Sequence, residues 1–154
     1  MSTTTMHRRD DEALVSVTVP ARTIDRLRDE VYCCLGGAGE RLDHAGFGHD
    51  AYCVEEMAVL IRQGVALLDV IGWDIVKYEN DFKLPADDIV EIPVGRVIAQ
   101  EVASYVGGGA RDNLRGVSGP LHPDERAAAE MCVDLADRFL RAVDDSTAGR
   151  GDAA

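Results

Sequence analysis

Apolar residues recur at steps of three and four over residues 24–45, and this spacing constrains the fold more than any other feature of the chain. A stripe with that period lies along one side of an α-helix and has to be buried against a partner. The stripe keeps its phase across the glycines at 36–39, although glycine inside a helix costs about 1 kcal/mol relative to alanine. We therefore expect one long helix. Its inner residues are Ile24, Leu27, Val31, Leu35, Ala38, Leu42 and Ala45.

Three more regions have the same helical period. A second helix is expected from about Tyr52 to Trp73, a third one opens at Pro93, and the last covers about 123–144. The glycines at 107–109 are expected to end or bend the third helix. The predicted inner residues are Val54, Met57, Leu60, Ile61, Leu68 and Ile71 in the second helix, Val94, Val97, Ile98, Val102, Tyr105 and Val106 in the third, and Ala128, Met131, Cys132, Leu135, Phe139, Ala142 and Val143 in the last.

Residues 13–19 alternate between valine and other residues, which is typical of a half-buried strand. Residues 74–93 have strand composition in two places and are compatible with a small β-hairpin near 75–92 or with a loop that covers the helices. The predicted fold class is therefore mainly α: a bundle of about four helices with a short N-terminal strand. The glycine clusters at 36–39 and 107–109 would let two backbones approach closely.

The length of 154 residues is typical of one domain. Polar and glycine-rich ends predict a disordered lead over 1–11 and a disordered tail over 145–154, which leaves a single helical domain over 12–144.

The chain has 28 Asp and Glu against 16 Lys and Arg, a formal net charge of −12. Such a charge repels nucleic acid and anionic membranes and suits a basic partner or a cation. The absence of a stretch of 18 apolar residues predicts no membrane span. Four cysteines without a C-x-x-C pair, and a start without the apolar core of a secretory signal, favour the cytoplasm.

The strongest chemical cluster is HAGFGHDAYC, in which His44, His49 and Cys53 have types and a separation that a divalent metal can use. The spacing matches no established zinc motif, and a solvated turn between two helices explains the residues equally well. A metal-dependent binder or enzyme centred on these three residues is therefore an alternative hypothesis.

A second alternative is a ribbon-helix-helix-like DNA-binding regulator. In that class a strand presents small polar residues to the major groove, and here Ser16 and Thr18 alternate with valines and precede Arg22, Arg26 and Arg28. Residues 1–35 hold five Arg against six carboxylates, however, and no second short helix follows. DNA binding needs an excess of cations, so a structural strand is the favoured interpretation.

No catalytic constellation is recognisable in the sequence. It has no G-x-S-x-G, no P-loop and no Glu-x-x-His, and the adjacent Cys33 and Cys34 are interpreted as structural thiols. The sequence therefore predicts a non-enzymatic binding or regulatory protein that acts through protein contacts. An edge strand at 13–19 needs a partner, so we also expect a homodimer.

Overall fold

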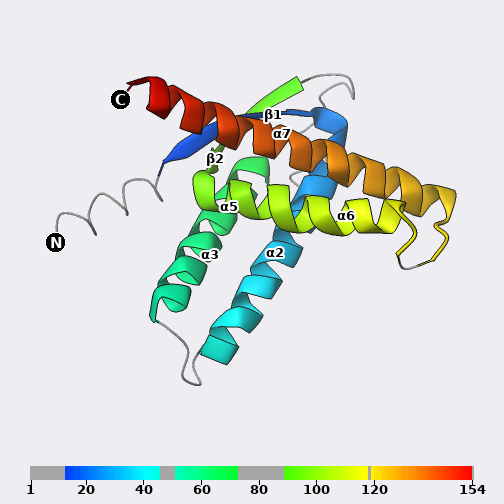
Figure 1. The fold of residues 1–154 in the computed structure, drawn as a ribbon, viewed down its shortest axis with the longest axis horizontal. Coiled ribbons are helices and arrows are strands. Elements are labelled where there is room, and N and C mark those ends of the chain that lie inside the picture. Colours follow the sequence, from blue (N-terminus) through cyan, green and yellow to red (C-terminus); the bar gives the residue numbers. More distant parts are fainter. Residues whose placement is uncertain (1–12, 46–50, 73–88, 118, 154) are drawn as a thin grey trace.

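The computed structural model describes residues 13–45, 51–72, 89–117 and 119–153. Within these ranges it is mainly helical with one small two-stranded antiparallel sheet, so the predicted fold class is confirmed (Figure 1). None of the helices in the described ranges is both long enough and apolar enough to pass through a membrane.

The sheet pairs β1 (Leu14–Pro20) with β2 (Ile89–Gly95), with Val17 opposite Ile92. The three valines of β1 are buried and the residues between them are exposed, which confirms the predicted alternation. The partner of β1 is thus a strand of the same chain, far away in sequence. Of the region near 75–92 where a hairpin was considered, only the residues of β2 lie within the described ranges.

Two long helices follow β1 and form an antiparallel pair that projects from the rest of the molecule (Figure 1). They are α2 (Ile24–Ala45) and α3 (Ala51–Ile71). As predicted, α2 continues through 36–39 without a break, because Leu27, Val31 and the following apolar residues gain more by burial than the glycines cost.

A second antiparallel pair crosses the first (Figure 1). Its first member is a continuous run of α5 (Arg96–Glu101), the π-helical segment η2 (Val102–Val106) and α6 (Gly107–Leu114). Its second member is α7 (Pro123–Ala153), which begins at the predicted proline. Leu135 and Phe139 of α7 are fully buried, and α7 packs against β1, α2, η2 and α6, so it closes the core.

One predicted boundary of the third helix is wrong, and one of the two outcomes predicted for the glycines at 107–109 is excluded. Pro93 lies in β2, where it is exposed and opposite Ser16, and the helix begins only at Arg96. A strand at the edge of a sheet tolerates proline, because the missing N–H faces away from its neighbour. The glycines at 107–109 do not end the helix either, since packing against α7 stabilises α6.

The predicted end of the last helix near residue 144 is also wrong. Residues 145–153, which were expected as a disordered tail, continue α7. The Thr147 hydroxyl donates to the carbonyl of Val143 at 3.0 Å and accepts from Arg96 at 2.8 Å. Each residue added to a helix that has already formed contributes one backbone hydrogen bond. The polar residues after position 144 therefore continue the helix at little cost in free energy.

Gln63 connects α3 to the junction between β2 and α5. Its side chain is 8% exposed, and its Oε1 accepts from the backbone N–H groups of Val97 at 2.9 Å and Ile98 at 3.2 Å. These amides belong to the first turn of α5, where backbone N–H groups have no carbonyl acceptor within the helix. Gly95 makes the contact possible, because a Cβ there would lie 2.4 Å from the Gln63 Cδ.

The glycine clusters differ from the expectation that both bring backbones together. A Cβ added to Gly36 or Gly39 would meet no atom within 4 Å. At Gly107, in contrast, it would lie 2.7 Å from the Cβ of Ala136 on α7. Close packing therefore requires glycine at position 107 but not at the predicted positions in α2.

We expect Gly36→Ala and Gly107→Ala to change stability in opposite directions. Gly36→Ala should raise the free energy of unfolding by up to about 1 kcal/mol, because alanine restricts the unfolded chain and favours the helix. Gly107→Ala should lower it by about 1–3 kcal/mol through overpacking against α7. Urea unfolding followed by circular dichroism measures both, and equal effects of the two variants would contradict the assignment of Gly107.

Replacing Gln63 by leucine should lower the free energy of unfolding by about 1–3 kcal/mol, because the half-buried amide of Val97 and the buried amide of Ile98 lose their acceptor. The matched control is Gln100→Leu, since Gln100 is exposed on α5. Chemical denaturation of both variants measures the difference. A loss at Gln63 no larger than that at Gln100 would show that other groups satisfy the two amides.

Candidate functional site

The predicted metal site lies mainly outside the described residues. His49 is outside them, and the structure describes only the backbone of His44, near the end of α2, and of Cys53, in the first turn of α3. Among the side chains that are described, no group of three or more His, Cys, Asp or Glu is arranged to hold a metal ion. The metal hypothesis for these three residues therefore stays a prediction.

The residues of β1 that were compared with a DNA-reading ribbon, Ser16 and Thr18, are exposed on the outer face of the sheet. The Ser16 hydroxyl donates to the carboxylate of Glu91 on β2. Arg26 Nη1 lies 3.7 Å from Glu30 Oε1, and Arg28 Nη2 lies 3.6 Å from Asp25 Oδ1. Because carboxylates accompany these polar and basic groups, the geometry adds no support for phosphate binding.

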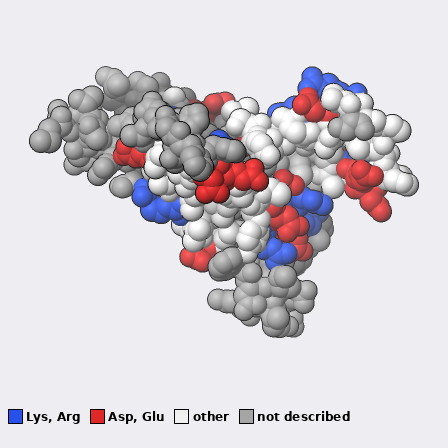
Figure 2. Space-filling view, turned by 90° about the horizontal axis from the view of Figure 1, so that it is seen from below, with Lys and Arg blue, Asp and Glu red and all other residues white. Residues whose placement is uncertain are grey.

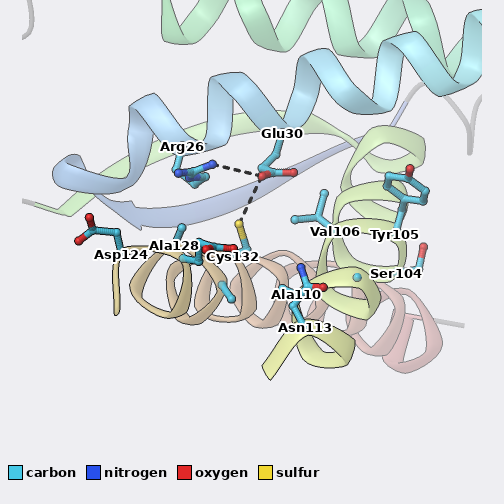
Figure 3. Close-up of a pocket in the computed structure, with 13 residues that line it drawn as sticks. Arg26, Glu30, Ser104, Tyr105, Val106, Ala110, Asn113, Asp124, Ala128 and Cys132 are labelled. Atoms are coloured by element: carbon cyan, nitrogen blue, oxygen red, sulfur yellow. Dashed lines mark hydrogen bonds and ion pairs between the residues drawn. The ribbon is translucent and has the colours of Figure 1, made fainter. Parts of the chain in front are cut away.

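The structure does form a groove that the sequence did not predict. It has a volume of about 830 Å³ and lies between α2 on one side and η2, α6 and the start of α7 on the other (Figure 3). Its floor consists of small and aliphatic side chains from η2, α6 and α7. They are Val106, Ala110, Ala128, Ala129 and Cys132.

Charged groups stand around this apolar floor. Arg26 and Glu30 point from α2 toward α7, and Asp124 and Glu125 contribute two carboxylates from the first turn of α7 (Figure 3). Carboxylates at this position are favourable for the helix, because its N-terminus carries a partial positive charge. The groove lining therefore has three carboxylates against one guanidinium, in agreement with the acidic chain.

The thiol in the floor is protonated. Cys132 Sγ donates a hydrogen bond to Glu30 Oε1 at 3.4 Å (Figure 3). Burial raises the pKa of Cys132 to about 12, and the negative charge of Glu30 adds to the effect. Since only the thiolate is a strong nucleophile or metal ligand, Cys132 contributes a packing group and a weak donor rather than a reactive one.

The adjacent cysteines of α2 lie in different surroundings. Cys34 is buried, and burial followed by the charges of Glu101 and Glu30 raises its pKa to about 12. Cys33 is exposed. The two are free thiols divided between core and surface, which agrees with their interpretation as structural residues.

Tyr105 forms one end of the groove, although the sequence placed it on the inner side of the third helix. It is 58% exposed, and it lies within the π-helical segment η2. A π turn contains an extra residue compared with an α turn, so it rotates the following side chains out of the regular stripe. Such segments are rare and frequently occur at functional sites.

Comparison of the chain with protein-family models, curated proteins and solved structures finds no match.

Sequence reasoning missed the groove because its walls come from segments far apart in the chain. One signal was present: small residues occupy 127–129 and position 132, where a bundle helix otherwise carries larger side chains. Small side chains on an inner helix face either allow close helix packing or leave a hollow, and only the tertiary structure distinguishes these outcomes.

We expect iodoacetamide at pH 8 to modify the exposed Cys33 faster than the buried Cys34 and Cys132. Glu30→Gln should speed alkylation of Cys132 several-fold, because removing a nearby negative charge lowers the pKa of that thiol. Glu40→Gln, at an exposed position of the same helix, is the control. Time-resolved peptide mass spectrometry measures each rate, and an unchanged Cys132 rate in Glu30→Gln would refute the coupling.

Proposed function

We propose that this chain is a non-enzymatic binding protein of the cytoplasm that acts through protein contacts, and that it works as a homodimer. In this proposal, the groove between α2, α6 and α7 receives a basic amphipathic helix from a partner protein. The observation that carries the proposal is the combination of an apolar groove floor with an excess of carboxylates at its edges.

Charge supports a basic occupant. Asp and Glu side chains form several separate clusters on one face of the molecule, with Arg side chains beside some of them (Figure 2). The whole chain has a formal net charge of −12. A basic partner is therefore attracted at long range by the protein and at short range by Glu30, Asp124 and Glu125.

The shape and composition of the groove support a helical occupant. Helices bind in apolar grooves by placing one hydrophobic stripe on the floor and their polar side toward solvent. The small residues Ala110 and Ala128 leave room for large side chains of the partner. Tyr105 and Arg26 are of the residue types that contribute most to protein interfaces.

The chemistry of the groove favours binding over catalysis. Its described lining contains no histidine, and its one thiol is held in the neutral form. General acid–base or nucleophilic catalysis requires a group whose pKa lies near the working pH. Free thiols at Cys33, Cys34 and Cys132 are also in keeping with a reducing compartment.

The proposal predicts binding of a Leu/Lys peptide of about four helical turns that forms an amphipathic helix. A peptide with Glu in place of Lys should not bind, and added salt should weaken the complex. Isothermal titration calorimetry with the full chain measures the dissociation constant. Gly109→Phe should raise it about tenfold or more, because the new ring occupies the groove.

Gly108→Phe is a matched control for this experiment. A Cβ at either glycine meets no atom within 4 Å, but Gly109 lines the groove and Gly108 does not. Both variants add the same ring to α6, so they should fold alike. Equal binding of the peptide by the two variants would show that it binds elsewhere on the acidic surface and would refute the groove as the partner site.

A further inference from the structure

The outer face of α3 is an exposed surface that includes apolar residues. Val65 is 44% and Val70 is 48% exposed, and Ala66 lies between them. The surface continues onto the sheet through Leu14, which is 68% exposed, and Pro93, with a hollow of about 280 Å³ between the helix and the strands. Contiguous apolar patches on a folded protein mark interaction sites more often than isolated apolar residues do.

Two charged residues flank the middle of this face. Arg62 and Asp69 are exposed and stand two helical turns apart, so they lie on the same side of α3. The point halfway between them lies between Val65 and Ala66. When a second α3 packs antiparallel about that point, Arg62 of each copy faces Asp69 of the other, and the apolar residues meet at the centre.

We infer that this face of α3 is the homodimer interface, with a two-fold axis between Val65 and Ala66 and two Arg62–Asp69 ion pairs across it. The inference rests on the homodimer part of the proposed function and identifies its surface. A two-fold interface uses the same patch on both subunits, so the patch must be complementary to itself. The arrangement of Arg62 and Asp69 about the centre satisfies this condition.

The same features favour a second copy over a different partner. The two charges on this stretch of the face are opposite in sign, so it has no excess charge to attract a basic or an acidic protein. The small side chain of Ala66 next to the axis allows two helices to approach closely. The face belongs to α3, and the groove is lined by α2, η2, α6 and α7, so both surfaces can be occupied at once.

Sedimentation equilibrium of the full-length chain with charge-reversal variants tests the inference. In Arg62→Asp, each of the two facing pairs consists of two carboxylates. In Asp69→Arg, each pair consists of two guanidinium groups. Each variant alone should have a dimer dissociation constant raised about tenfold or more, because two attractive pairs become repulsive. An equimolar mixture of the two variants should form a heterodimer, because opposite charges then face each other again.

Two exposed residues elsewhere provide matched controls. Arg22→Asp and Asp145→Arg change the net charge by the same amounts but lie outside α3, so dimerisation should be unaffected. If Arg62→Asp and Asp69→Arg dimerise as the unmodified chain does, the interface lies elsewhere and the inference fails, while the proposed homodimer stands. An unmodified chain that stays monomeric at about 100 μM refutes both.

The groove is assessed separately in the same samples. Titration of Arg62→Asp with the Leu/Lys peptide should give the affinity of the unmodified chain, because the groove contains no residue of α3. Loss of dimerisation together with unchanged peptide binding supports two independent surfaces. Loss of both by a variant that keeps the circular dichroism spectrum of the unmodified chain would show that the peptide binds the α3 face, which overturns the interface as inferred.

Discussion

The arrangement of this protein depends on two backbone amides at the start of α5 that need an acceptor away from water. Gln63 of α3 supplies it, and Gly95 leaves the space for its side chain. The contact fixes α3 against the junction where β2 ends and α5 begins. Because β2 also pairs with β1, which leads directly into α2, one polar interaction joins the helical hairpin to the sheet and to the second helical pair.

The two proposed surfaces follow from this arrangement. The hairpin of α2 and α3 crosses the pair formed by α5–α6 and α7 (Figure 1). One side of α2 lines the groove, and Val65 and Val70 of α3 are exposed elsewhere. The groove is acidic with an apolar floor, whereas on α3 the opposite charges of Arg62 and Asp69 lie on either side of an apolar centre. The two proposals therefore assign a basic partner to the groove and a second copy to the α3 face, because the charges around the two apolar centres differ.

Sequence periodicity predicted the long helix through 36–39, the alternation in β1 and the start of α7 at Pro123, because each depends on contacts within one segment. It failed at Pro93, Tyr105 and the end of α7. Pro93 lies in a strand whose partner is remote in sequence, and Tyr105 lies in a helical turn that contains an extra residue. The end of α7 depends on the extension of a helix that packing already stabilises. The sequence also could not show that Gly107 packs closely against another helix whereas Gly36 and Gly39 do not.

The sequence by itself determined the class of the fold, the positions of most helices and the acidic character, since amphipathic period and charge are properties of neighbouring residues. Only the tertiary structure decided that β1 pairs within the chain, that Glu30 meets Cys132 and that a hollow forms between α2 and α7. Those features depend on the distances between segments, which local periodicity does not contain.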